Sequence, residues 1–183
     1  KVKESLQNLK YDFDSLTVDP SKFIKQIKNL KKQNIFFNAL HGTYGEDGHI
    51  QKILENNNLF YTHSNSKTSK IAFDKNLTKL HIKKLNIPLI ESISFSKNNL
   101  SADVLYKTFE KFGPFVLKPV SSGSSFGIKI FYSKRDIDIF NKNFESEINT
   151  YENHNEIMLE KYIKGRELTV GVWQNNNIAE SLA

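Results

Sequence analysis

The spacing of apolar residues predicts alternating helices and strands in the first third of the chain. Asp19 followed by Pro20 is typical of a helix start, because aspartate caps a helix and proline suits its first turn. The apolar run at 35–40 has the length and character of a strand covered on both faces. The elements expected here are helices over 1–10, 19–32 and 49–57 and strands over 15–19 and 35–40. Such alternation predicts an α/β unit with a parallel sheet, which binds ligands at the carboxyl ends of its strands.

The pattern from about Ser64 onward predicts a second unit that is richer in strands. For example, Leu105, Phe109 and Phe112 have the spacing of a helix, and the Gly-Pro pair at 113–114 ends that helix. The elements expected here are helices over 65–73, 74–86, 101–112 and 134–144 and strands over 90–95, 115–120, 128–132, 157–163, 166–174 and 178–182. We therefore expect an N-terminal α/β region at 1–63, a central α+β region at 64–160, and the start of a third region at 161–183.

Composition is that of a globular chain and excludes several kinds of site. Hydrophobic residues make up 38% and charged residues 25% of the 183 positions, far from the composition of disordered proteins. The absence of cysteine excludes disulfides, thiolate metal sites and a cysteine nucleophile. No apolar run has the length of a membrane span, and residues 1–10 do not resemble a signal peptide. We expect a soluble, cytoplasmic chain with no membrane partner.

The net charge of +6 does not by itself predict a nucleic-acid partner. Only Arg135 and Arg166 among the 26 basic residues are arginine, the residue that phosphate-clamping and base-reading surfaces favour. The densest basic stretch, 22–32, carries its lysines opposite apolar residues at helical spacing, as a solvated helix face does. We therefore expect no nucleic-acid partner. A basic nucleic-acid binder remains an alternative, and it would lose affinity steeply with added salt.

Two glycine-rich stretches are candidates for ligand binding. Residues 41–48 read His-Gly-Thr-Tyr-Gly-Glu-Asp-Gly, so that backbone can approach a ligand beside His41. The alternative is a tight turn whose Asp47 caps the next helix. In 118–127, Lys118 ends an apolar strand and precedes a Ser/Gly loop that offers N–H groups and hydroxyls to phosphate. The order differs from a P-loop, and an ordinary hairpin connection with an exposed lysine is the alternative.

Two further stretches carry charged residues at positions where they could bind a ligand. Lys75 follows Asp74 at an expected helix start, where the positive helix end favours anions, although a solvated lysine is the simpler interpretation. In 157–167, Glu160 and Glu167 bracket a turn and could accept hydrogen bonds from an amino group and from ribose hydroxyls. Strand alternation puts Glu160 on the opposite face from Lys161. Ordinary surface charges on a hairpin are the alternative.

Taken together and in order, these stretches resemble the D-alanine–D-alanine ligases of the ATP-grasp superfamily. The agreement runs from about Asp19 to the end, and His-Gly-x-x-Gly-Glu-Asp-Gly at 41–48 is its most specific part. The residues that carry the resemblance are 38–42, 45–48, 61–62, 72–75, 116–119, 123–127, 160–163 and 167–170. The resemblance implies an N-terminal parallel-sheet, Rossmann-like domain followed by an ATP-grasp domain.

The resemblance implies ATP as the nucleotide, with Mg²⁺ or Mn²⁺. It places Lys75 and Lys118 on the phosphates and Glu167 on the ribose. On the adenine it places Glu160, with Tyr162 beside the ring, and the backbones of Lys161 and Ile163. It assigns Ser124, Ser125 and Gly127 to a mobile loop that closes over the phosphates.

The resemblance also implies the reaction, which joins two D-alanines through an acylphosphate for peptidoglycan precursor synthesis. His41 would face the first D-alanine, and Ser124 would help to position it. The protein would be a possible homodimer. Ser122 differs from the family, which has an acidic residue at that place.

The resemblance further implies that the chain lacks the family's first strand and most of its C-terminal domain, including the metal ligands. We therefore expect these 183 residues alone to be an inactive fragment of a ligase. A sister ligase that uses D-lactate or D-serine, and a non-catalytic nucleotide-binding module, remain alternatives.

Overall fold

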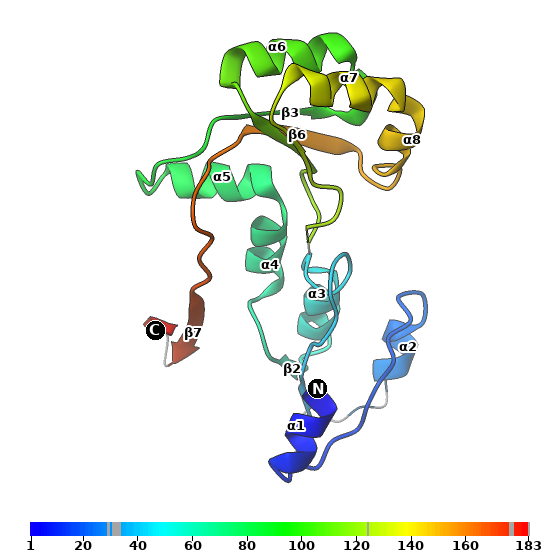
Figure 1. The fold of residues 1–183 in the computed structure, drawn as a ribbon. Coiled ribbons are helices and arrows are strands. Elements are labelled where there is room, and N and C mark those ends of the chain that lie inside the picture. The colour runs from blue at the N-terminus through cyan, green and yellow to red at the C-terminus, as the bar shows by residue number, and fades with distance from the viewer. Residues whose placement is uncertain (29, 31–33, 124, 176–177, 183) are drawn as a thin grey trace.

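The fold is a mixed α/β structure with one small parallel sheet and two antiparallel sheets (Figure 1). The structure is a computed structural model that describes residues 1–28, 30, 34–123, 125–175 and 178–182. The predicted mixture of a parallel-sheet unit and a strand-rich α+β unit is confirmed, whereas the predicted boundaries after residues 63 and 160 stay predictions. Within the described ranges, no helix is long and apolar enough to cross a membrane.

The N-terminal region packs short elements around one helix. Its elements are α1 (Val2–Asn8), α2 (Phe23–Ile27), β1 (Ile35–Phe36), α3 (His49–Asn56) and β2 (Phe60–Tyr61). β1 and β2 pair in parallel, as the α/β pattern predicts, with Ile35 opposite Phe60. One face of α3 buries Ile50 and Leu54 against Phe23 of α2. This small core fixes the start of α3, and with it the loop at 41–48.

Several predictions for this region are wrong in extent. The expected strand at 15–19 is an irregular segment, and the helix expected from Asp19 begins at Phe23. Three positions of its expected C-terminal end, 29, 31 and 32, lie outside the described residues. The strand expected at 35–40 is restricted to 35–36, and Ile35 is 72% exposed. Burial of a strand requires layers on both faces, and an apolar run alone does not supply them.

The central region is built on a four-stranded antiparallel sheet of order β3-β6-β4-β5. Its elements are α4 (Ser66–Phe73), α5 (Lys75–Lys83), β3 (Ser92–Ser96), the 3-10 turn η1 (Lys97–Asn99), α6 (Ala102–Phe112), β4 (Phe115–Pro119), β5 (Lys129–Phe131), α7 (Lys134–Lys142), α8 (Phe144–Asn149) and β6 (Glu156–Lys161). Asn65, Asp74 and Ser101, the first residues of three predicted helices, are the N-caps of α4, α5 and α6. α8 and β2 were not expected from the sequence.

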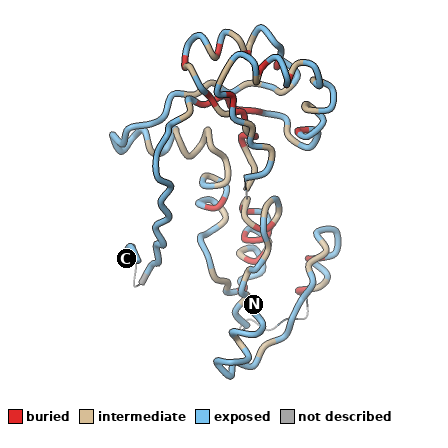
Figure 2. The backbone as a smooth tube through the Cα atoms, in the orientation of Figure 1, coloured by how far each residue is buried: buried red, intermediate tan, exposed pale blue. Residues whose placement is uncertain are grey.

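The two faces of the central sheet have different characters. Leu117 of β4 and Leu159 of β6 point into the main core, which α6 and α7 cover. Side chains alternate along a strand, so Lys118 and Glu160 project from the opposite face, on the side of α5 (Figure 1). Figure 2 shows buried residues gathered in the sheet and the two helices above it. The sheet thus holds a charged pair rigidly at the edge of a packed core.

The last part of the chain forms a separate hairpin. β7 (Gly171–Asn175) pairs antiparallel with β8 (Ile178–Leu182). The strand expected at 166–174 therefore begins only at Gly171, after an exposed irregular segment. The expected strand at 178–182 is confirmed.

Candidate functional site

Lys75 connects the start of α5 to the Ser/Gly loop between β4 and β5. Its amino group donates to the carbonyl oxygens of Val120 (3.3 Å) and Ser122 (3.0 Å). The neighbouring Asp74 caps α5 and also accepts from the Ser121 hydroxyl at 3.3 Å. The lysine is therefore held against the loop that the sequence analysis singled out, and the solvated-lysine alternative does not describe it.

Glu160 and three lysines form a compact charged group, which we call the lysine cluster: Lys75, Lys79, Lys118 and Glu160. One carboxylate oxygen of Glu160 pairs with Lys118, and the other lies 2.7 Å from the amino group of Lys79. The Glu160 residue is only 8% exposed. The cluster is cationic, because it holds three ammonium groups and one carboxylate, which, among these described residues, only Lys79 and Lys118 contact.

The pKa shifts in the lysine cluster follow from this charge excess. Burial lowers the pKa of Lys75, and the positive charge of Lys118 lowers it further. Burial by itself would raise the pKa of Glu160, but the hydrogen bonds and charges of Lys118 and Lys79 outweigh it, and the pKa lies below its usual value. An anion bound beside Lys75 would relieve the repulsion between the lysines. The donor set therefore fits a phosphate chain.

The Ser/Gly loop turns sharply at its far end. Gly127 has φ +66°, and a Cβ at this position would lie 3.0 Å from the Tyr151 ring and 3.2 Å from Pro119. Its carbonyl oxygen accepts from the Tyr151 hydroxyl at 2.7 Å. Ser125 is exposed and also has a positive φ of 58°. Ser124 lies outside the described residues, so its predicted role has no structural counterpart here.

The loop at 41–48 faces the Ser/Gly loop. The Glu46 carboxylate accepts from the Gly42 N–H at 2.7 Å and lies 3.6 Å from the His41 ring. A Cβ on Gly123 would approach Glu46 to 3.0 Å, so the two loops come close at this point. Asp47 accepts from the N–H groups of Tyr44 and His49, so the tight turn of the alternative interpretation is present, whereas the N-cap of α3 is Gly48 and not Asp47. The role of His41 beside a ligand stays a prediction.

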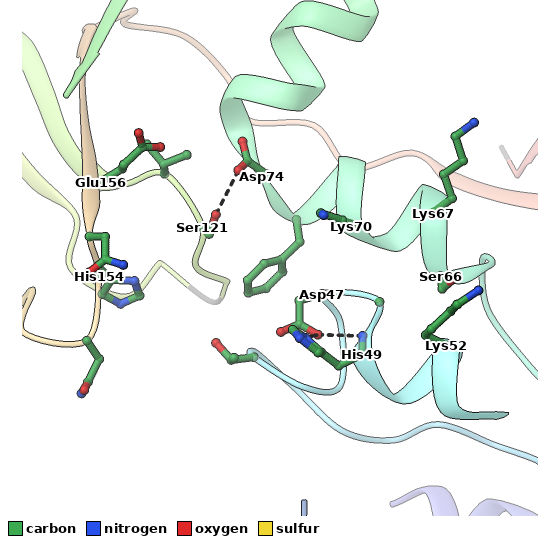
Figure 3. A pocket seen from close by; sticks show the side chains of 16 residues that line it. Asp47, His49, Lys52, Ser66, Lys67, Lys70, Asp74, Ser121, His154 and Glu156 are labelled. Atoms are coloured by element: carbon green, nitrogen blue, oxygen red, sulfur yellow. Dashed lines mark hydrogen bonds and ion pairs between the residues drawn. The ribbon is translucent and has the colours of Figure 1, made fainter. Parts of the chain in front are cut away.

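Two adjoining clefts lie between the N-terminal and central regions. The smaller one, of about 360 Å³, is lined by His41 and Gly42 on one side and Ser122 and Gly123 on the other. The larger one, of about 960 Å³, opens between α3, α4 and the segment before β6. Figure 3 shows Lys52, Lys67 and Lys70 along one part of it, with His154 and Glu156 across from them. Phe73 and His154 line both clefts.

The segment that follows Glu160 is tied to the sheet at its start. The Lys161 N–H donates to the Glu91 carbonyl, and the Tyr162 N–H donates to the Pro114 carbonyl. The Tyr162 ring packs edge-on against Tyr132, with centroids 5.1 Å apart. Ile163 and Glu167 are exposed, and within the described chain Glu167 makes no ion pair with the lysine cluster. The structure brings together Glu160 and the two predicted phosphate lysines but leaves Glu167 apart from them.

Two residues at the site were not singled out from the sequence. Lys79 lies four positions after Lys75, on the same face of α5, and this spacing is the signal that could have identified it. His154 precedes β6 in an irregular segment without a motif. Burial and the positive charges of Lys75 and Lys97 lower its pKa, and its ring packs against Phe126. In the described parts of the chain, no three His, Asp or Glu side chains gather to hold a metal ion.

Comparisons with known proteins bear on the family of the chain. The family model described as "D-ala D-ala ligase C-terminus" matches residues 81–182. A D-alanine–D-alanine ligase of Fervidobacterium nodosum is 36% identical over 94% of this chain and 55% of the relative. The chain thus spans about half the length of that curated relative.

Solved structures give the same result. A D-alanine–D-alanine ligase from Bacillus anthracis is 29% identical with a TM-score of 0.68, over 97% of this chain and 62% of that one. A structure of a ligase with the same name and source, complexed with ATP, is 33% identical with a TM-score of 0.64, over 86% of this chain and 50% of the other.

Proposed function

Because the chain belongs to the D-alanine–D-alanine ligase family, we propose that the protein carrying it joins two D-alanines in an ATP-dependent reaction for peptidoglycan precursor synthesis. The observation that carries the proposal is the lysine cluster, where Lys75 and Lys118 lie beside the Ser/Gly loop with charge in excess. This arrangement favours a nucleotide ligase over a nucleic-acid binder, because the lysines are drawn inward and do not form an exposed stripe.

The proposed reaction proceeds in two steps. The carboxylate of one D-alanine attacks the terminal phosphoryl group of ATP. An acylphosphate forms, and ADP leaves. The amine of the second D-alanine then attacks the acyl carbon of the acylphosphate, and inorganic phosphate leaves. The protein must neutralise charge on the transferred group and exclude water from an intermediate that hydrolyses readily.

Lys75 and Lys118 are proposed to neutralise the phosphate charge. Lys75 is half-buried, and its ammonium is fixed by two loop carbonyl oxygens, so little reorganisation is needed when an anion arrives. Lys118 extends from a strand with a packed far face. Preorganised cations in a partly buried site stabilise developing charge more strongly than mobile ones on a surface. Ser125 and Gly127, with Ser124, are proposed to close over the same phosphates.

The adenine and ribose are proposed to bind beyond Glu160. Its carboxylate would accept from the amino group of the base, with Tyr162 beside the ring. Because the Lys161 N–H is already bonded to Glu91, a backbone contact by Lys161 would use its carbonyl oxygen. Ile163 would add a second backbone contact, and Glu167 is proposed to reach the ribose hydroxyls.

The first D-alanine is proposed to bind in the smaller cleft. His41 lines one wall, and the backbone of Ser122 and Gly123 lines the other, so a small zwitterion would lie between the two loops. Its carboxylate would point toward the phosphates held by Lys75. Ser124 is proposed to help position this substrate. We also predict that the reaction uses Mg²⁺ or Mn²⁺. The protein is further predicted to be cytoplasmic and a possible homodimer.

A coupled assay of ADP release with D-alanine and ATP tests the function, with the protein as its gene encodes it. We expect ATP-dependent formation of D-alanyl-D-alanine and a loss of at least about 100-fold in kcat/KM for Lys75→Met and for Lys118→Met, as for lost transition-state contacts. Lys84→Met, at the exposed end of α5, is the matched control and should keep full activity. Nucleotide binding without any dipeptide would favour a binding module, and faster turnover with D-serine or D-lactate a sister ligase.

A further inference from the structure

Glu160 divides its two carboxylate oxygens between two lysines from different elements. Lys118 of β4 holds one oxygen, and Lys79 of α5 holds the other. All three side chains are largely buried, with 21% exposure for Lys79, 18% for Lys118 and 11% for Glu160. A carboxylate this enclosed is costly to leave unpaired, because burial penalises its charged form.

Lys79 is anchored independently of the other cations. Its amino group also donates to the Ile90 carbonyl at 2.5 Å, in the segment that leads into β3. Lys79 lies one turn after Lys75, so α5 presents one ammonium to the Ser/Gly loop and a second to Glu160. Lys118, in contrast, has Glu160 as its partner among the described residues. The two lysines that contact Glu160 therefore differ in how firmly they are held.

This difference matters if Lys118 contacts a phosphate. An ammonium that turns toward an anion must leave Glu160, and the carboxylate then needs another cation to stay ionised and in place. We infer that Lys79 is a positioning residue that keeps Glu160 ionised and oriented toward the nucleotide base while Lys118 moves to the phosphates. The inference rests on the proposed function only in taking the ligand to be a nucleotide.

Equilibrium binding of ADP, measured by isothermal titration calorimetry on the protein as its gene encodes it, tests this role. Lys79→Met removes the charge and keeps the length of the side chain. We expect the Kd for ADP to rise at least tenfold, because Glu160 then retains Lys118. In the ligation assay the KM for ATP should rise by a similar factor, while kcat at saturating ATP and the KM for D-alanine change less than about twofold.

Two variants separate positioning from folding. Lys79→Arg retains a cation within reach of Glu160 and should recover at least half of the lost affinity on a logarithmic scale. Lys83→Met, one turn further along α5 and exposed, is the matched control and should bind ADP as the unchanged protein does. Equal losses in Lys79→Arg and Lys79→Met would overturn the inference, since they would indicate a packing role.

The pH dependence of ADP binding is a readout that a purely structural role would not move. The charged groups facing Glu160 are Lys118, Lys79 and, less directly, Lys75. Removal of Lys79 should raise the pKa of Glu160. As the pH is lowered, Lys79→Met should therefore lose ADP affinity at a higher pH than the unchanged protein does. Superimposable pH profiles would contradict the inference.

The outcomes distinguish this inference from the proposed function. ADP binding that depends on Lys79, in a protein that forms no dipeptide, would refute the ligase proposal and support the positioning role. Normal ligation with unchanged ADP affinity in Lys79→Met would refute the positioning role alone. Failure of the unchanged protein to bind ADP would overturn both.

Discussion

The N-terminal and central regions differ in the size of the buried core that each forms. Eleven described residues form the buried core of the central region, where two helices cover a four-stranded sheet. Only five form the core of the N-terminal region, beside a sheet of two short strands. Figure 2 shows the contrast as a concentration of buried residues around the central sheet and long exposed stretches in the N-terminal region.

The difference indicates which region fixes the site. Lys118 and Glu160 project from strands whose other face is fully packed, so their positions are determined by a rigid sheet. His41 lies in a loop after a two-residue strand, and its side chain is 83% exposed. We expect the backbone on the phosphate side of the site to be preorganised, so that only the Lys118 ammonium has to turn, and the amino-acid side to depend on how the two loops approach each other.

The largest expected effect compares the two cores directly. Leu117→Ala in β4 should reduce the free energy of unfolding by about 3–5 kcal/mol, because the surrounding sheet cannot relax into the cavity. Leu54→Ala in α3 should cost about 2–3 kcal/mol, near the lower end of that range, because its small core can collapse more easily. Urea denaturation followed by far-UV circular dichroism measures both. A larger loss for Leu54→Ala would reverse the comparison.

The second prediction compares the buried carboxylate of Glu160 with the half-buried carboxylate of Glu55 in the N-terminal region. Glu160→Gln should lower stability at pH 7 by about 2 kcal/mol, since it leaves two lysines without their shared partner. The pKa of Glu160 is lowered in the folded state, so its contribution is present above the ordinary value of about 4.3 and is lost as the pH falls through the folded value. The difference in the free energy of unfolding between the two proteins should therefore shrink as the pH falls below the ordinary value and disappear below the folded pKa of Glu160.

Glu55 provides the matched comparison. Its pKa is also lowered, mainly by hydrogen bonds from Ser66 and then from Tyr61, and among the described residues its ion-pair partner is the single lysine Lys52, at 3.9 Å. Glu55→Gln should show the same sign of pH dependence with a smaller amplitude. An equal or larger amplitude for Glu55→Gln would show that the lysines contribute little to the stability that Glu160 provides.

The smallest expected effect concerns the Ser/Gly loop, which connects β4 to β5 and lies against the N-terminal loop at 41–48. Gly127→Ala should cost about 1–2 kcal/mol, because the residue has a positive φ and its new methyl group would press on Tyr151 and Pro119. Gly165→Ala is the control, with no atom within 4 Å of the new methyl group and no positive φ. Thermal unfolding of the two variants measures the difference. Equal midpoints would show that the Ser/Gly loop adapts without strain.

Helical periodicity and capping residues predicted the central region well. The helix starts at Asn65, Asp74 and Ser101 are local, because each side chain caps the N–H groups that follow it. The strand predicted at 35–40 was wrong in extent and exposure, because its burial depends on other layers and not on its own residues. The strand predicted at 166–174 begins late for the same reason, since pairing with β8 starts only at Gly171.

The sequence by itself determined which residue types are available to bind phosphate and in which order they occur. Lys75 and Lys118 were assigned to phosphate by the family resemblance, because the local signals at each, a helix start and the end of an apolar strand, fit a solvated lysine equally. The sharing of Glu160 between Lys118 and Lys79 was decided only by the tertiary structure, because it depends on the approach of α5 to one face of a sheet. Electrostatic pairing acts through space over a few ångströms, and residues separated by eighty positions come that close only when the core has packed.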